Sequence, residues 1–319
     1  MEKMEFQKMQ CDVLVIGGAA AALTAALEAR KRVENVVVVC KKNVGRSGNT
    51  MVAAAAFSAF IPSPDHPDSA ERHLRDTLKA GAEINDPFLA RALAEEGGNA
   101  VLSLEEYGVR LFRRDGSLVR RTPPGHSTPR TLLTDPTNHT AATPGLSITV
   151  PLAESAKTRG IRILNHVTVL QLSVRDGAVC GALALDNRTG IRMRIAAKAV
   201  ILASGGGGRL FAMTNNTSDM TGDSYALALE AGAALRDMEF IQFFPTRTTS
   251  PIHTTIANRL FAEGAVLRNR HGENFMFRYD PKADMATRDV MSRAIYSEMK
   301  AGRGVEGGVY IDLSALPEP

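Results

Sequence analysis

The sequence predicts an α/β fold organised around a parallel sheet, with an antiparallel β meander attached. An apolar run at residues 11–16 ends at two glycines, and an alanine-rich helical stretch and a second apolar run at residues 36–39 follow. Strand, helix and strand within about 30 residues form the βαβ unit of a parallel sheet. A third apolar run, within residues 196–208, ends in four glycines. It predicts a further buried strand that leads into a turn.

The segments between these strands alternate between helical and irregular patterns. Residues 43–59 are small and Ala-rich and follow neither a strand nor a helix period. Helices are predicted at residues 68–80, 86–107 and 149–159. Residues 113–145 hold many Pro, Thr, Arg and Gly residues, which predicts an irregular loop.

The meander follows in the second half of the chain. Apolar runs at residues 161–174 and 178–186 flank an Asp-Gly turn, the pattern of antiparallel strands. Residues 221–235 then predict a helix that ends in a tight connection.

The composition changes near Glu239, where aromatic residues cluster and prolines interrupt the pattern. We therefore expect one domain over residues 1–238 and a second over residues 239–319. The last predicted helix covers residues 284–300, with Asp284 as its N-cap and a glycine beyond its end.

The charge and the cysteine count exclude several classes of protein. The chain of 319 residues holds 38 Lys and Arg against 34 Asp and Glu, a small and scattered excess that argues against a nucleic-acid surface. Its apolar runs are far shorter than the ~20 residues of a membrane helix. Cys11, Cys40 and Cys180 are isolated from one another, which indicates reduced thiols and no metal centre. We expect a cytoplasmic protein with no nucleic-acid partner and no direct membrane insertion.

The turn after the first strand is typical of a dinucleotide site. A strand, a Gly-rich turn and a helix direct backbone N–H groups and the helix dipole at one point, which suits a pyrophosphate. The turn reads Gly17-Gly18 followed by alanines, so the second and third glycines of the usual GxGxxG pattern are absent. The usual acidic residue after the second strand is replaced by Cys40. The pattern alone also fits an ordinary buried βαβ unit.

Seven blocks in one order resemble a known family. The blocks are VIGGAAAALTAALEA, KKNVGRSGNT, AVILASGGGGRLF, TGDSYALALEAGAALRDMEFIQFFPT, AEGAVLRNRHGENFMFRY, ATRDVMSRAI and GRGVEGGVYIDLS. Together they resemble the flavoprotein subunits of succinate dehydrogenase and fumarate reductase, and L-aspartate oxidase. The resemblance implies a Rossmann-like FAD-binding domain, and then the beginning of an α+β capping domain that carries part of the substrate site.

The resemblance also implies which residues hold FAD. For the pyrophosphate they are Gly17, Gly18, Ala19, Ala20 and Ala21. For the ribityl chain and the isoalloxazine they are Lys41, Arg46, Ser47, Gly48, Asn49, Thr50 and Met51. The adenine end would meet the backbone of Val167, and Ser204, Gly205, Gly206 and Asp223 would complete this half of the site. The alternative for Asp223 is that it caps the N-terminus of the helix that begins near Ser224. No histidine follows the Arg-Ser pair at 46–47, so we expect non-covalent FAD.

The family transfers hydride between flavin N5 and a carbon beside a carboxylate, and the resemblance implies Arg288 as the proton-transferring residue. An ion pair between Arg288 and Asp284 on the helix surface is the alternative. Phe244 stands where the family has a substrate-contacting histidine, and Ala262, followed by Glu263, stands where it has a threonine. Two hydrogen-bond donors are thus missing, and His253 is a weak candidate to replace them. We expect a small carboxylate-bearing substrate other than succinate, such as a bulkier acid, an enoate or a thioester.

Three nearby residues are weaker candidates. His126, in a Gly-His-Ser sequence similar to one in the aspartate oxidases, either lines the site or caps backbone. Arg130 is a candidate anion contact, and Arg293 is expected to be structural.

Three functions stay open at this point. The first is an FAD-dependent oxidoreductase acting on CH–CH groups, whose possible partner, an iron–sulfur electron-transfer subunit, would hold it peripherally at the membrane. The second is a non-catalytic or electron-relay flavin-binding subunit, and the third is a protein that binds no flavin. Family members continue past the Ile-Asp-Leu-Ser block, so we expect these residues alone to be inactive.

Overall fold

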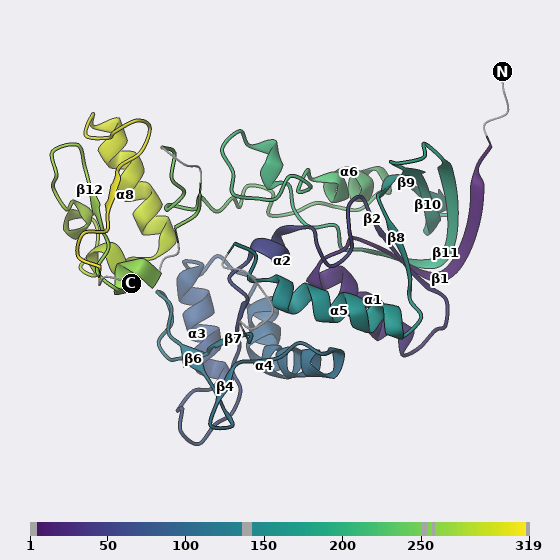
Figure 1. Cartoon of the computed structure of the whole chain (residues 1–319), viewed down its shortest axis with the longest axis horizontal. Helices are drawn as coiled ribbons and strands as arrows, with labels where there is room; N and C mark the ends of the chain where they lie inside the picture. The colour runs from purple at the N-terminus through teal and green to yellow at the C-terminus, as the bar shows by residue number, and fades with distance from the viewer. Residues whose placement is uncertain (1–4, 136–141, 251–253, 257–258, 317–319) are drawn as a thin grey trace. The chain divides into compact units, whose positions relative to one another are not determined.

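The computed structural model describes residues 5–135, 142–250, 254–256 and 259–316 (Figure 1). The chain forms two compact units. Unit 1 comprises Met1–Thr122 and Thr128–Arg236, and unit 2 comprises Pro123–Ser127 and Asp237–Pro319.

Unit 1 is built on a six-stranded mixed sheet. Its strands lie in the order β8 (Arg162–Asn165), β2 (Val36–Cys40), β1 (Gln7–Ile16), β11 (Arg192–Leu202), β10 (Ala178–Asp186) and β9 (Val167–Arg175). The first four strands are parallel, and β11, β10 and β9 are antiparallel. This confirms the expected α/β fold with a parallel sheet and an antiparallel meander.

One expected strand is two strands. The apolar run 161–174 breaks at His166, whose φ of 59° is left-handed. Before the break β8 pairs in parallel with β2, and after it β9 pairs antiparallel with β10. The meander is therefore β9–β10–β11. Both halves of the run are apolar, so the hydrophobic pattern did not mark the break.

Helices cover both faces of the sheet. On one face α1 (Ala20–Arg30) and α5 (Leu146–Thr158) pack together and against the sheet, around Leu23, Leu27 and Leu152. On the other face α6 (Asp223–Glu230) contributes Leu227 to a second core. All five residues of β2 are buried, as expected for a strand covered on both faces.

Unit 1 also contains further helices and small sheets outside the central sheet. They include α2 (Asn49–Val52), α3 (Ala70–Ala80) and α4 (Pro87–Ser103), with 3-10 turns at Leu104–Tyr107 and Gly208–Leu210. A three-stranded sheet has the order β3 (Ala56–Ser58), β7 (Thr131–Leu133) and β6 (Arg120–Arg121), and β4 (Arg113–Arg114) pairs with β5 (Ser117–Leu118). The expectation of an irregular loop at 113–145 was therefore wrong in part. Strands of two or three residues are too short to show a period.

Arg130, which directly precedes β7, joins that strand to α3 and to the segment before α3. Its side chain is 1 % exposed and forms ion pairs with Asp68, at 2.8 Å, and with Asp76. The guanidinium also donates to Thr128 Oγ1 at 2.7 Å. The expectation that Arg130 contacts an anionic ligand is corrected, because the carboxylates of Asp68 and Asp76 in its own unit already pair with the charge.

Unit 2 contains α7 (Arg259–Ala262), β12 (Val266–Arg268) paired with β13 (Tyr310–Asp312), and α8 (Arg288–Lys300), with 3-10 turns at Met276–Arg278 and Ala283–Met285. The helix expected from residue 284 begins at Arg288, with Thr287 as N-cap. Asp284 is buried and accepts a hydrogen bond from Leu267 N at 2.8 Å. Asp284 is therefore not the N-cap of α8, because its carboxylate is buried against β12 and binds the backbone there.

A charged network fixes the end of α8. Glu298 is fully buried and accepts hydrogen bonds from Arg303 Nε (2.8 Å), Arg278 Nη2 (3.1 Å), Asn269 Nδ2 (3.0 Å) and Tyr279 Oη (2.7 Å). The hydrogen bonds from Arg303 above all, aided by those from the other donors, hold the pKa of Glu298 well below its usual range. This anchors the helix whose first residue is Arg288.

Candidate functional site

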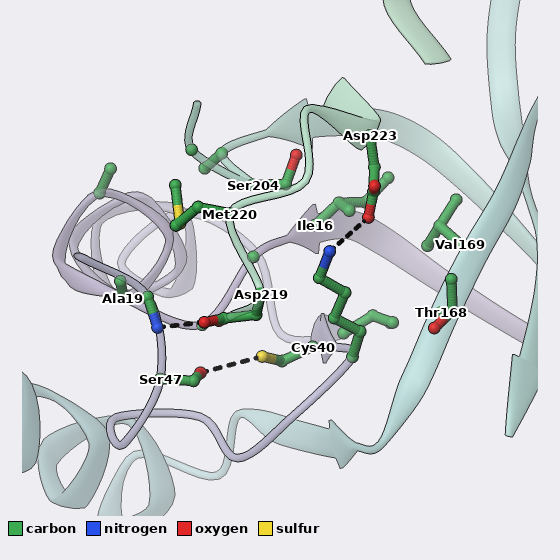
Figure 2. Close-up of a pocket in the computed structure, with 18 of the residues that line it drawn as sticks. Ile16, Ala19, Cys40, Ser47, Thr168, Val169, Ser204, Asp219, Met220 and Asp223 are labelled. Atoms are coloured by element: carbon green, nitrogen blue, oxygen red, sulfur yellow. Dashed lines mark hydrogen bonds and ion pairs between the residues drawn. The ribbon is translucent and has the colours of Figure 1, made fainter. Parts of the chain in front are cut away.

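A cavity of about 240 Å³ opens in unit 1 at the carboxyl ends of the parallel strands (Figure 2). Its walls come from the ends of β1 and β2, the loops that follow β1, β2 and β11, the start of β9, and the segment leading into α6. Ligands of open α/β sheets bind at this edge, where the strand order changes direction.

The turn after β1 requires glycine for steric reasons. Gly17 has φ +140°, and a Cβ there would lie 2.3 Å from the carbonyl oxygen of Ala203. A Cβ on Gly18 would lie 2.6 Å from Cys40 Sγ. Because the turn passes this closely between β2 and β11, both glycines are needed by the fold itself.

The helix after this turn begins at the cavity without a side-chain cap. Its N-cap, Ala19, is extended (φ −103°, ψ −164°) and makes no side-chain cap hydrogen bond. Ala19 and Ala21 line the cavity. The positive end of the helix dipole and its unsatisfied N–H groups thus face a space that suits an anion.

Polar groups line the opposite part of the cavity. Lys41 Nζ forms an ion pair with Asp223 Oδ2 at 2.7 Å (Figure 2). It also donates a hydrogen bond to Thr221 Oγ1. Burial alone would raise the pKa of Asp223, but the hydrogen bonds from Lys41 and Thr221 outweigh burial and lower it. Ser204 Oγ is buried and has no hydrogen-bond partner in the described part of the chain. A buried hydroxyl in this state is explained by a ligand or water that it binds.

Sequence reasoning missed the segment that closes the cavity. Gly48 N donates to Asp219 Oδ2 at 2.9 Å, and Thr217 N donates to Asn49 Oδ1 at 3.1 Å. These bonds join the loop after β2 to the segment before α6. A run of Asn, Thr and Ser resembles an ordinary turn, and the only signal was the position of Asp219 four residues before Asp223.

Most residues expected at the cofactor lie together on the cavity wall. These are Gly17, Gly18, Ala19, Ala21, Lys41, Ser47, Gly48, Asn49, Thr50, Val167, Ser204, Gly205 and Asp223. Ala20, Arg46, Met51 and Gly206 are not on that wall. The structure adds Ile16, Val39, Cys40, Thr168, Val169, Ala203, Asp219, Met220 and Leu227. Cys40, whose role sequence left open, both lines the cavity and lies 3.4 Å from Ser47 Oγ.

In unit 2, Arg288 packs against the segment that precedes Pro245. Its Nη1 donates to Gln242 Oε1 at 3.1 Å, and its Cζ lies 4.7 Å from the centroid of the Phe244 ring. The residue keeps solvent-exposed surface, yet partial desolvation lowers the pKa of its guanidinium. The alternative of an ion pair with Asp284 is wrong, since Gln242 is the partner of Arg288.

The other expected substrate residues do not meet Arg288 in the part of the chain that is described. Ala262 ends α7, Glu263 follows it, and both are exposed. His253 lies outside the described residues. Arg293 pairs with Asp289 at 2.8 Å on the surface of α8.

Metal-binding clusters and membrane-spanning helices are both absent from the residues that the structure describes. Among them, no group of three or more His, Cys, Asp or Glu side chains is arranged to hold a metal ion. No helix within the same residues is long and apolar enough to cross a membrane.

Comparison with known proteins gives consistent matches over nearly the whole chain. Residues 12–318 match the family model described as an FAD binding domain. The chain is 38 % identical over 319 residues to a subunit of the fumarate reductase (CoM/CoB) of Methanothermobacter marburgensis, covering 99 % of this chain and 57 % of the relative. It is 33 % identical over 312 residues to the L-aspartate oxidase of Neisseria meningitidis serogroup B, covering 96 % and 60 %.

A solved structure matches at the level of the fold and the sequence. The FrdA chain of an E. coli quinol fumarate reductase variant superposes with a TM-score of 0.84 at 26 % identity, over 97 % of this chain and 54 % of that one. The chain thus spans a little over half the length of the relatives it matches.

Proposed function

This chain belongs to the FAD-binding-domain family of flavoproteins, and we propose that it is the flavin-binding part of an oxidoreductase that acts on a small carboxylate-bearing substrate. Its relatives include fumarate reductase subunits and L-aspartate oxidases. Its cofactor is FAD, which confirms the expectation from the resemblance. The reaction, its substrate and its partners are the proposal.

The cavity in unit 1 fits the cofactor chemically. The uncapped start of α1 suits the pyrophosphate, and the Lys41–Asp223 pair and the Ser204 hydroxyl offer polar contacts to a ribose or the flavin. The single observation that carries the assignment is the Ser204 hydroxyl, which lies on the cavity wall, is buried and has no hydrogen-bond partner among the described residues. When bound, FAD supplies hydride chemistry at its N5 position.

Arg288 is the proposed proton-transferring residue. An arginine normally has a pKa above ~12 and rarely gives up a proton. Partial desolvation lowers the pKa of Arg288, which is the direction that proton transfer requires. The same guanidinium offers a planar fork of N–H donors to a substrate carboxylate.

The proposed substrate is a small carboxylate other than succinate. Phe244 places an aromatic ring next to Arg288, where the related enzymes that the sequence resembles carry a hydrogen-bonding histidine. A lost hydrogen bond to a charged group costs about 1.5–3 kcal/mol. The apolar ring instead favours an acid with a bulkier or less charged second end.

A second candidate function rests on the same ring. Without donors at Phe244 and Ala262, the protein could hold flavin and pass electrons without acting on an acid. Two relatives are named as subunits of fumarate reductases, so we propose that the partner in either case is an iron–sulfur electron-transfer subunit. Flavin that is reduced by a partner but by no carboxylate would favour this second function.

The mode of flavin attachment gives the first test. Gly48, Asn49 and Thr50 follow the Arg-Ser pair, and none of them can form a covalent bond to the isoalloxazine as histidine does. The purified protein is expected to show flavin absorbance, and acid precipitation should release all of the colour into the supernatant. Flavin that remained in the pellet, with a matching increase in intact mass, would contradict non-covalent binding.

The helix end gives the second test. Ala19→Asp is expected to raise the Kd for FAD by about 5–30-fold, because a carboxylate there repels the pyrophosphate by about 1–2 kcal/mol. The same change should stabilise the protein without FAD, since aspartate caps a helix about 1 kcal/mol better than alanine. A lower FAD affinity together with a higher Tm of the apo protein would show that Ala19→Asp weakens cofactor binding without damaging the fold.

Ala19→Asn is the matched control. It supplies the cap without the charge, so its Tm should rise while its FAD affinity stays closer to wild type. Titrating FAD into both apo proteins by flavin fluorescence measures the two affinities. Equal weakening in both variants would show that the start of α1 does not face the pyrophosphate.

A further inference from the structure

Arg288 contacts a short segment of unit 2 whose backbone is fixed to α8. Ser292 Oγ, one turn along the helix, donates to the carbonyl oxygen of Phe243 at 2.7 Å. Gln242 and Phe244, on either side of that carbonyl, are the two residues that meet the Arg288 guanidinium. The segment therefore presents one acceptor and one aromatic ring to the same side chain.

The carboxylates closest to Arg288 in sequence are engaged elsewhere. Asp289 pairs with Arg293 at 2.8 Å and accepts from Thr287 Oγ1 at 2.5 Å. Asp284 is buried and accepts from Leu267 N. Among the described residues no carboxylate pairs with Arg288, and desolvation is the cause of its lowered pKa. Within the described residues, the positive charge of Arg288 thus has no carboxylate counter-ion.

The contacts with Gln242 and Phe244 leave most N–H donors of the Arg288 guanidinium available to a ligand. Arg288 Cζ lies over the Phe244 ring at 4.7 Å from its centroid. A guanidinium that stacks on a ring through its own face keeps its N–H donors available, because they lie in the plane of the group. Gln242 accepts from one of the five donors. A carboxylate that approaches in the plane still finds a pair of parallel N–H groups.

We infer that Phe244 is a positioning residue, which stacks on the Arg288 guanidinium and, with Gln242, holds it in the orientation that presents its free N–H edge to a carboxylate. In this arrangement the aromatic ring at 244 orients the arginine, and the arginine alone binds the acid. This inference rests on the proposed function of Arg288, but the stacking itself can be measured without turnover.

Two variants separate the ring from its apolar volume. Phe244→Leu removes the aromatic face and keeps an apolar side chain, whereas Phe244→Tyr keeps the face. The full chain loaded with FAD, labelled with ¹⁵N-arginine, gives the Arg288 Nε–H signal, which Arg288→Lys identifies. In wild type and Phe244→Tyr the ring current should shift the side-chain proton signals of Arg288 upfield. Phe244→Leu should return them to the position of an exposed arginine.

A chemical readout accompanies the spectra. Phenylglyoxal modifies arginine side chains, and peptide mass mapping reports its rate at Arg288. A cation–π contact at a partly exposed site corresponds to about a 2–5-fold effect, so Phe244→Leu should react about 2–5-fold faster and Phe244→Tyr at the wild-type rate. Arg293 serves as the internal reference, since its rate should not change.

The outcomes separate this inference from the proposed function. If the Arg288 signals and its modification rate are the same in wild type and Phe244→Leu, with both proteins folded as shown by equal Tm, the inference is overturned. If the ring-current shift is present but Arg288→Lys turns over carboxylates normally, the positioning stands and the proposed proton transfer fails.

Discussion

In the active, FAD-loaded protein that contains this chain, replacing Arg288 by lysine is expected to lower turnover by about 10²–10⁴-fold, the range typical for loss of a general acid or base. Lysine keeps the positive charge but cannot lie flat on Phe244, cannot offer a planar fork, and carries its proton at a different place. The measurement is stopped-flow reoxidation of reduced flavin by a set of small unsaturated acids. Flavin absorbance should be unchanged, because Arg288 belongs to unit 2 and the cofactor cavity is lined by unit 1.

Arg293→Lys is the matched control for this experiment. It lies on the same helix, and its partner is Asp289 in an exposed ion pair. Such pairs contribute about 0–1 kcal/mol, so turnover should stay within about twofold of wild type. A loss of the same size in both variants would indicate damage to α8 rather than removal of a proton-transferring group.

Replacing Arg130 by methionine is expected to lower the free energy of unfolding by about 3–5 kcal/mol at neutral pH. The arginine is 1 % exposed, and Asp68 beside it is 6 % exposed. Removing the cation leaves the Asp68 charge buried without its counter-ion. Urea unfolding followed by circular dichroism measures the loss, and substituting Asp68→Asn in the Arg130→Met protein should recover part of it.

The same pair predicts a dependence on pH. Burial would raise the pKa of Asp68, but the hydrogen bonds from Arg130 and from backbone outweigh burial and lower it from 3.8 to about 2. In wild type this stabilisation is present above pH 3.8 and is lost as pH falls toward 2. In Arg130→Met, burial dominates, so protonating Asp68 relieves the strain. The stability gap between the two proteins should therefore narrow below about pH 4, and a gap that stayed constant would contradict this account.

Local patterns were sufficient for the centre of the fold. The sequence predicts β2 and α1 correctly. A strand buried on both faces is a continuous apolar run, and a closely packed helix is rich in alanine. The break at His166 was not predictable in this way. Whether an apolar run continues or changes partner depends on which strand it meets. β10 follows the run directly, but β2, the partner of its first half, lies more than 100 residues earlier in the chain.

The candidate site divides in the same manner. Gly17, Gly18 and Lys41 follow directly from their strands, so their place at the sheet edge was predictable. Asp219 gained its position only when the loop after β2 and the segment before α6 came together, through its hydrogen bond from Gly48 N. Arg130 shows the reverse case, since an arginine in a loop resembles a ligand contact until the two carboxylates that surround it are known.

The pairing of β1 has a consequence for how the chain is made on the ribosome. β1 bonds to β2 on one side and to β11 on the other, where Cys11 and Ala196 meet across 185 residues of sequence. Until β11 has left the ribosome, one edge of the central strand has no partner, and a long apolar edge invites pairing between chains. Nascent chains in which β11 is missing or still inside the ribosome should therefore depend on chaperones more strongly than chains in which residues 192–202 have emerged.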